Sequence, residues 1–386
     1  MFTTFAVKFL AWFMSVLVTL GTTFGFFVKP TTTAPEDYYD GNIKNVIYLI
    51  GDGMGFNHLE KTKAENNVSL VMDTFEIKGS SMTRSFTNTV TDSAAGGTAL
   101  STGIRTANGA IGVYPLDLNS KYSYPKNITE LCMEMGKLTG VVTTDSTSGA
   151  TPSSFSAHSS DRDNKEDISD DQLASGINLI WGAANGYVTE DAATESGYDY
   201  IANYDEMMAL EEGSYSFAQF SGDLWEPEST SEGTPTLEEM AVKAVDILDD
   251  TDEGFFLMIE GAHIDKHSHN NDGEKMKRAL ISFDNTIEAM LEYAKADGET
   301  LVIITADHET GAIKLNKNGE YKYNSGSHSA ANVPVLVYGT DKIIASGEKL
   351  NNYEIPTRIA YILGADETSF PVAISTITET YRKKTK

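Results

Sequence analysis

The sequence predicts an α/β fold in which a mostly parallel central sheet is covered by helices on both faces, and two observations carry this prediction. Short, continuous, β-branched apolar runs recur along the 386-residue chain, as buried parallel strands require. Helical patterns with one apolar face lie between these runs. Because sheets of this kind bind ligands beyond the carboxyl ends of their strands, we expect the polar residues that end the strands to meet in one crevice.

Four apolar runs are expected to form strands of this sheet: residues 45–50, 140–144, 255–259 and 301–305. Asp52 follows the first of them, Glu260 follows the third, and Asp307 and His308 follow the fourth. These four side chains are therefore expected to converge, and a metal site is expected at the carboxyl ends of the strands.

Two amphipathic helices are predicted between the strands. Residues 236–248 carry apolar side chains on one face and begin with a capping box formed by Thr236 and Glu239. Residues 276–294 repeat the helical period, and Gly298 follows as a stop signal. The acidic, weakly periodic stretch 159–233 is expected to form surface insertions near the site.

The N-terminal residues 1–28 are predicted to be a signal peptide or a signal anchor. Lys8 precedes an almost uncharged run from Phe9 to Phe27, which suits either interpretation. Residues 29–41 follow as a polar linker, and residues 42–386 form the main domain. Either alternative predicts export from the cytoplasm, to an extracellular or cell-surface location. Membrane contact is expected only through the N-terminal segment, if that segment is not cleaved.

The composition narrows the range of partners. Acidic residues outnumber basic ones, 56 against 29, and the net charge of −27 repels polyanions, so nucleic acid binding is not expected. An anionic substrate must therefore be held by local cations. The single cysteine, Cys132, excludes an intramolecular disulfide, and its apolar surroundings predict a core position in a short helix.

Histidines and carboxylates are concentrated in the C-terminal half of the chain. Five of the seven histidines lie between residues 263 and 328, interleaved with aspartate and glutamate. Neutral imidazole together with carboxylate suits zinc, whereas carboxylate and hydroxyl oxygens suit magnesium. One isolated histidine would more often be structural, but a cluster that follows predicted strand ends favours metal binding.

Residues 91–100 (TDSAAGGTAL) predict a serine, Ser93, at the start of a helix. The free N–H groups of a helix N-terminus favour a phosphate held beside the serine oxygen. A plain helix cap is the alternative, and for this segment in isolation it is the better interpretation. A serine hydroxyl needs a base or a metal to become a nucleophile, and the absence of a Gly-x-Ser-x-Gly elbow favours a metal.

Taken together, these segments resemble those of the alkaline phosphatase family. Six motifs occur in the family order: residues 51–55 (GDGMG), 91–96 (TDSAAG), 150–162 (ATP, then AH and Arg162), 260–269 (EGA, IDK and a histidine), 305–308 (TADH) and 326–328 (GSH). The resemblance runs from residue 46 to about 338. Each motif is modestly specific, and the ordered set is strongly specific.

The resemblance implies an enzyme that hydrolyses phosphate monoesters through a phosphoserine on Ser93, with two zinc ions and one magnesium ion. It implies the following ligands: Asp265, His269 and His328 for the first zinc; Asp52, Asp307 and His308 for the second; and Asp52, Thr151 and Glu260 for magnesium. By the same resemblance, Arg162 would clamp two phosphate oxygens and Lys266 would contact phosphate through water. Many members of the family are homodimers, so a homodimer is an expectation here.

The chain departs from the family at Gly149, two residues before Thr151, where a side chain usually supports the magnesium-bound water. We interpret this departure as a weakened magnesium site, and the alternative is a glycine that only permits a turn or a close approach. His158 and His263 lie in matched segments and are expected to serve packing or support. Two other functions stay open: a phosphodiesterase of the same superfamily, and a non-catalytic surface protein that binds zinc or phosphate.

Overall fold

The computed structural model describes residues 38–115, 124–222, 224 and 233–371. The predicted signal segment 1–28 and most of the predicted linker 29–41 lie outside these residues, so both stay predictions. Within the described ranges, no helix has the length and apolar character needed to cross a bilayer.

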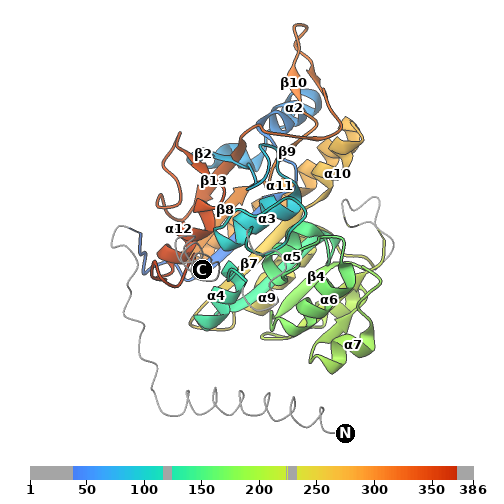
Figure 1. The fold of residues 1–386 in the computed structure, drawn as a ribbon, viewed down its shortest axis with the longest axis vertical. Helices are drawn as coiled ribbons and strands as arrows, with labels where there is room; N and C mark the ends of the chain where they lie inside the picture. The colour runs from blue at the N-terminus through green and yellow to red at the C-terminus, as the bar shows by residue number, and fades with distance from the viewer. Residues whose placement is uncertain (1–37, 116–123, 223, 225–232, 372–386) are drawn as a thin grey trace, which may run out of the picture. The chain divides into compact units, whose positions relative to one another are not determined.

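The described residues form a central sheet of ten strands (Figure 1). In spatial order the strands are β14 (Lys349–Asn351), β2 (Ile77–Met82), β13 (Val333–Tyr338), β8 (Thr300–Thr305), β1 (Asn45–Gly51), β7 (Phe255–Gly261), β3 (Leu138–Ser146), β4 (Leu179–Ala183), β6 (Ser216–Phe220) and β5 (Asp199–Ile201). β13 runs antiparallel to both of its neighbours, and the other pairings within this sheet are parallel. The predicted fold class is confirmed.

All four predicted strands are present, as β1, β3, β7 and β8. In the register of the sheet, Ile50 of β1 lies opposite Glu260 of β7 on one side and Thr305 of β8 on the other. The carboxyl ends of three neighbouring strands are therefore level. This alignment brings together the polar residues that follow them.

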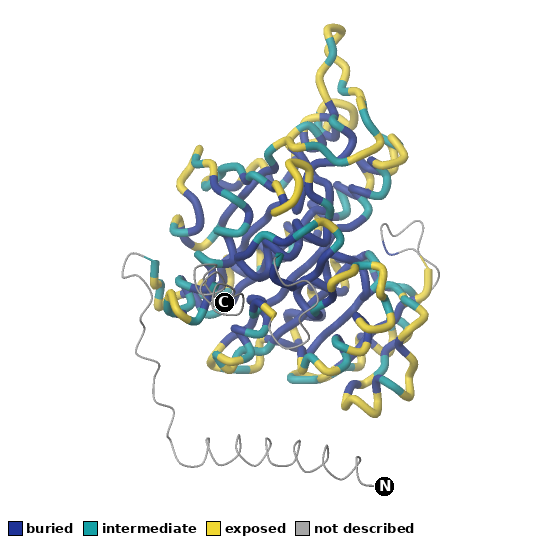
Figure 2. The backbone as a smooth tube through the Cα atoms, in the orientation of Figure 1, coloured by how far each residue is buried: buried dark blue, intermediate teal, exposed yellow. Residues whose placement is uncertain are grey.

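Helices cover both faces of the sheet (Figure 1). Along β1, Ile47 and Leu49 join one buried cluster, whereas the alternate residues Val46, Tyr48 and Ile50 join the other. The first cluster is covered by α9 (Leu237–Leu248) and α11 (Gly273–Asp297), and the second by α4 (Ile128–Glu134), α5 (Ala150–Ser156) and α12 (Glu354–Ile362). Figure 2 shows the buried backbone of the sheet between more exposed outer elements.

The two predicted helices correspond to α9 and α11. Thr236 caps α9 and forms the predicted capping box with Glu239. Gly298 ends α11 in the left-handed conformation. The core position predicted for Cys132 is confirmed, because this residue lies in α4 and is fully buried.

The stretch 159–233 differs from the expected surface insertions. It contains three sheet strands, β4, β6 and β5, together with the short helices α6 (Lys165–Ala174), α7 (Glu190–Glu195) and α8 (Tyr204–Met208). Leu179, Trp181 and Phe217 are fully buried in these strands. The strands are at most five residues long and alternate with acidic, exposed helices, which hides their apolar character in the sequence.

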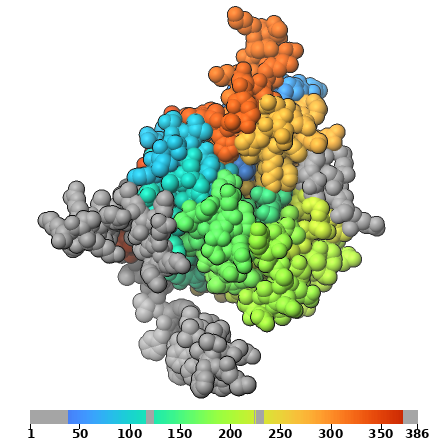
Figure 3. Space-filling model, turned by 45° about the vertical axis from the view of Figure 1, so that its right-hand side comes forward, coloured from blue at the N-terminus to red at the C-terminus, as the bar shows by residue number. Residues whose placement is uncertain are grey.

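The remaining described elements lie outside the ten-stranded sheet. They are α2 (Phe56–Asn66), the 3₁₀ helix η1 (Val71–Thr74), α3 (Ser93–Thr102), α10 (His263–His269), and the short strand pairs β9 (Glu309–Thr310) with β12 (His328–Ser329) and β10 (Lys314–Leu315) with β11 (Tyr321–Lys322). Pairing of His328 with Thr310 brings β12 back beside His308. The β10–β11 hairpin projects beyond α10 (Figure 3).

Candidate metal centre

The first group of site residues lies beyond β1 and β8. Nε2 of His308 is 3.4 Å from Oδ1 of Asp52 and 3.2 Å from Oδ2 of Asp307. Oδ1 of Asp307 accepts the backbone N–H groups of Gly53 and His308, which fixes the carboxylate. Asp52, Asp307 and His308 thus offer ligand atoms that all lie within 4.8 Å of one another.

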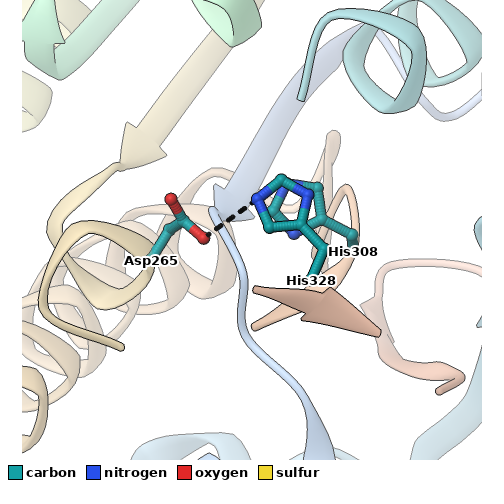
Figure 4. A group of neighbouring side chains, drawn as sticks. All are labelled: Asp265, His308 and His328. Atoms are coloured by element: carbon teal, nitrogen blue, oxygen red, sulfur yellow. Dashed lines mark ion pairs between the residues drawn. The ribbon is translucent and has the colours of Figure 1, made fainter. Parts of the chain in front are cut away.

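The second group combines α10 with β12. Nε2 of His269 lies 3.3 Å from Oδ2 of Asp265 and 3.0 Å from Nε2 of His328. Oδ1 of Asp265 lies 3.7 Å from Nε2 of His328, and Figure 4 shows this pair beside the stacked ring of His308. The predicted first zinc set therefore converges. His308 is close to both groups, because its ligand atom also lies within 4.8 Å of those of Asp265 and His328.

The three imidazoles are oriented by contacts on their other ring nitrogen. Nδ1 of His269 lies 2.8 Å from the carbonyl of Gly326, and Nδ1 of His328 lies 2.9 Å from the carbonyl of Thr91. Since a carbonyl can only accept, Nδ1 carries a proton in both rings, and Nε2 is the nitrogen that faces the carboxylate of Asp265. Nδ1 of His308 lies 3.3 Å from the Thr310 hydroxyl. Such contacts hold ligands in place around a metal.

Ser93 is the first residue of α3 and is 5% exposed. Its Oγ lies 3.1 Å from Nε2 of His308. Asp92 caps the helix by accepting the N–H of Ala95 at 3.0 Å. A β-carbon at position 96 would lie 2.9 Å from the carbonyl oxygen of Asp307, so glycine lets α3 approach the end of β8 closely. The predicted helix start is confirmed.

The third group, Thr151 and Glu260, lies on the other side of β1. Thr151 is in the first turn of α5, which packs on β3 and β7, and Glu260 belongs to β7. A carboxylate oxygen of Glu260 accepts a hydrogen bond from the Thr143 hydroxyl. Thr151 and Glu260 are each 1% exposed. These residues supply oxygen donors only.

The buried carboxylates carry more negative charge than their surroundings balance. Burial, and then repulsion by Asp307, holds the pKa of Asp52 well above its usual range. Burial, and then repulsion by Asp145, raises the pKa of Glu260 to about 8. Burial lowers the pKa of His308 to about 4, so this imidazole is neutral and can bind a cation. Bound cations would relieve this repulsion.

Unpartnered oxygen atoms give an independent test of metal binding. Oδ1 of Asp52, Oδ2 of Asp307 and Oγ1 of Thr151 are buried and form no hydrogen bond with the described part of the chain. Buried polar atoms are almost always satisfied, so these three require a partner. The mixed nitrogen and oxygen sets fit zinc, and the oxygen-only set fits magnesium.

The two predicted anion-binding residues are each held by a carboxylate. Nη1 of Arg162 donates to Oδ2 of Asp92 at 3.2 Å, and its side chain remains one third exposed (33%). Nζ of Lys266 forms an ion pair with Asp145. Both cations border the site, and their carboxylate partners fix their positions.

Three residues in these contacts had not been predicted to serve the site: Asp92, Asp145 and Thr310. Thr310 donates to Oδ1 of Asp265 as well as contacting His308. Asp145 follows directly on the predicted strand 140–144, so the rule that selected Asp52 and Glu260 could have found it. His158 and His263 belong to neither histidine-containing ligand group. Nδ1 of His263 contacts the Thr144 hydroxyl at 3.2 Å.

Comparison with known proteins links this geometry to one family. The sequence model described as alkaline phosphatase matches residues 43–180 and 182–323. Alkaline phosphatase 4 of Bacillus subtilis (strain 168) is 33% identical over 304 residues, which cover 73% of this chain and 65% of that protein. The chain therefore spans slightly less than two thirds of that relative's length.

Solved structures with a similar fold include the alkaline phosphatase from the Antarctic bacterium TAB5. The match covers 84% of this chain and 99% of that one, with a TM-score of 0.74 and 30% identity. A variant of the TAB5 enzyme was solved with magnesium bound. Its match covers the same fractions of the two chains, with a TM-score of 0.73 and 28% identity.

Proposed function

Because this chain belongs to the alkaline phosphatase family, we propose that it is a phosphatase that hydrolyses phosphate monoesters through a phosphoserine on Ser93. One observation carries this proposal: the buried hydroxyl of Ser93 lies 3.1 Å from Nε2 of His308, at the start of a helix. It stands beside Asp52 and Asp307, each of which has one carboxylate oxygen that forms no hydrogen bond among the described residues. A nucleophile, a helix N-terminus and cation ligands are thus combined at one point.

The residues present fit two zinc ions and one magnesium ion. One zinc would be held by Asp265, His269 and His328, the other by Asp52, Asp307 and His308, and magnesium by Asp52, Thr151 and Glu260. When bound, these cations would supply Lewis-acid stabilisation of the negative charge on the serine oxygen and on the leaving oxygen.

The side chains of the protein supply the nucleophile and bind the phosphate group. Oγ of Ser93 loses its proton and bonds to phosphorus while the bond from phosphorus to the alcohol oxygen breaks, and the alcohol leaves with a proton. The oxygen of a water molecule then bonds to phosphorus, the bond to Ser93 breaks, and Ser93 regains a proton. Arg162, held by Asp92, orients two phosphate oxygens through its planar guanidinium group. Lys266 adds positive charge nearby.

A pair of chromogenic substrates tests this proposal. We expect the protein supplied with zinc and magnesium to hydrolyse a monoester much faster than the matching diester. Faster hydrolysis of the diester would identify a phosphodiesterase. Binding of zinc or phosphate without hydrolysis of either ester would identify a non-catalytic protein. Labelled phosphate trapped on Ser93 after acid quenching would establish the covalent intermediate.

The expected setting of the enzyme follows from its sequence. Small phosphate monoesters are the proposed substrates, and the net charge of −27 disfavours nucleic acid. We propose an extracellular or cell-surface location, with membrane contact only through an uncleaved N-terminal segment, and a homodimeric assembly. Cell fractionation and light scattering of the purified protein test these two points.

A further inference from the structure

One carboxylate beside the third ligand group has no part in the mechanism above. Asp145 lies near the carboxyl end of β3, the neighbour of β7, and its side chain is 25% exposed. Its backbone N–H donates to Oγ1 of Thr143 at 2.8 Å, and the same hydroxyl donates to Glu260. Asp145 is therefore connected to Glu260 through a single side chain.

The carboxylate of Asp145 fills the space beside Gly149. A β-carbon at position 149 would lie 2.9 Å from Cγ of Asp145 and closer still to its Oδ2. The backbone of Gly149 has a φ of −56°, which any residue can adopt, so conformation alone does not require glycine. The close approach of Asp145 requires it. A side chain is missing at 149, but a carboxylate reaches the same place from 145.

The charges around this place favour a divalent cation. Asp145 and Glu260 lie on either side of Thr143, which hydrogen-bonds with both residues, so two carboxylates are close together here. Oγ1 of Thr151 is buried and unpartnered among the described residues. Lys266 contributes one positive charge to this group. Oxygen donors with excess negative charge suit magnesium, which keeps several of its water molecules and relies on nearby carboxylates to hold them.

We propose that Asp145 belongs to the magnesium site of this chain and supplies the carboxylate that position 149 lacks. This inference rests on the proposed function in taking the third metal to be magnesium. The ammonium of Lys266 shares the carboxylate of Asp145, so Lys266 and magnesium compete for it. The chain thus has a complete magnesium site instead of the weakened one that Gly149 suggests in the sequence.

Calorimetric titration of the zinc-loaded protein with Mg²⁺, without substrate, tests the proposal. We expect Asp145→Asn to weaken Mg²⁺ binding by about 10–100-fold, the usual effect of losing a group that supports a metal site. Lys266→Ala should tighten binding, because it removes the competing cation. Asp246→Asn is the matched control: it breaks the Lys243–Asp246 ion pair, 3.0 Å long on α9, and should leave the Mg²⁺ dissociation constant unchanged.

Moving the carboxylate gives a second test. Gly149→Asp alone should bind Mg²⁺ poorly, because its side chain meets that of Asp145. In the double variant Asp145→Ala, Gly149→Asp the carboxylate of Asp145 no longer meets the new side chain, and only the carbonyl oxygen of Ser146 stays close, 3.0 Å from the β-carbon. Mg²⁺ binding should therefore recover in large part. If the Gly149 variants fail to fold, the Mg²⁺ dissociation constants of Asp145→Asn and Lys266→Ala are sufficient to test the proposal.

Two results would overturn the inference. An unchanged Mg²⁺ dissociation constant in Asp145→Asn would show that Asp145 serves only to hold Lys266. Absence of Mg²⁺ binding by the wild-type protein would remove the site altogether. Failure of the proposed function is a separate result. Monoester hydrolysis can be absent while the Mg²⁺ dissociation constants of the variants still differ from the wild-type value in the expected directions.

Discussion

Oγ of Ser93 and Nε2 of His308 lie 3.1 Å apart, although 215 positions separate them in the chain. The contact joins the first residue of α3 to the segment that follows β8. Burial lowers the pKa of His308 to about 4, so its Nε2 atom presents a lone pair toward the serine. The serine oxygen therefore lies beside the ligand atom of the proposed zinc site, within reach of a metal held there.

Replacing Ser93 with alanine should remove the covalent route. We expect Ser93→Ala to lower the turnover number by about 10⁴-fold or more, with residual hydrolysis by direct attack of water. Zinc content should stay at the wild-type level, because all of the proposed zinc ligands are unchanged. Steady-state kinetics and metal analysis of the same preparations measure both quantities, and turnover within tenfold of wild type would exclude Ser93 as the nucleophile.

Removal of metal should abolish activity and lower stability. The unpartnered oxygens of Asp52, Asp307 and Thr151 and the repulsion among the carboxylates leave the site dependent on cations. After chelation, zinc should restore most of the activity and magnesium should add to it. Full activity in protein shown by elemental analysis to be metal-free would contradict this expectation.

Arg162 should contribute more to phosphate affinity than to the rate of the chemical step. A lost charge-assisted hydrogen bond costs about 1.5–3 kcal/mol, so we expect Arg162→Ala to raise the inhibition constant of inorganic phosphate by roughly 10–100-fold. Arg162→Lys should recover little of this loss, because an ammonium lacks the planar fork. Inhibition measured at fixed pH for the three proteins gives the comparison, and wild-type affinity in Arg162→Ala would disprove the clamp.

His158 should make stability depend on pH. Burial opposes its protonation, but the carboxylates of Asp171 and Glu130, 3.5 and 3.7 Å away, outweigh burial and raise its pKa. A raised folded-state pKa stabilises the protein below the unfolded pKa of about 6.5, and this stabilisation disappears as pH rises through the folded value. The Tm difference between wild type and His158→Gln should therefore be larger at pH 5.5 than at pH 8.5. A constant difference would show that His158 acts through packing alone.

The thiol of Cys132 should be unreactive toward alkylating reagents in the native protein. It is fully buried, and burial raises the pKa of its thiol to about 12. Iodoacetamide should therefore leave the native chain unmodified at pH 8, and one thiol should react after unfolding in guanidinium chloride. Mass spectrometry distinguishes the two states.

The sequence predicts the centre of this protein better than its periphery. The strands that carry Asp52, Glu260 and Asp307 are long, continuous and apolar, so their ends could be located. Asp145 directly follows the predicted strand 140–144, as Glu260 follows 255–259, so the same strand-end rule indicates this carboxylate. β4 and β6 are short, and the acidic helices between them conceal their burial.

Contacts between distant segments could not be predicted from local patterns. Thr310 hydrogen-bonds Asp265 only because β9 and α10 meet in the folded chain. Likewise, the effect of Asp145 on Gly149 depends on how β3 turns into α5, which neither residue type determines. Side-chain spacing indicates which residues can bind a metal, and tertiary structure decides which residues support them.

The central position of β1 has a consequence for how the nascent chain folds. Val46 pairs with Phe256 on one side and with Leu301 on the other, so β1 is synthesised more than 200 residues before either neighbour. Until then its apolar side chains have no sheet to join, and such delayed, non-local pairing makes folding slow and exposes the chain to aggregation. His328 follows later still. The metal centre therefore cannot form until nearly the whole domain has left the ribosome, and a chaperone that binds the early apolar segments should increase the yield of active protein.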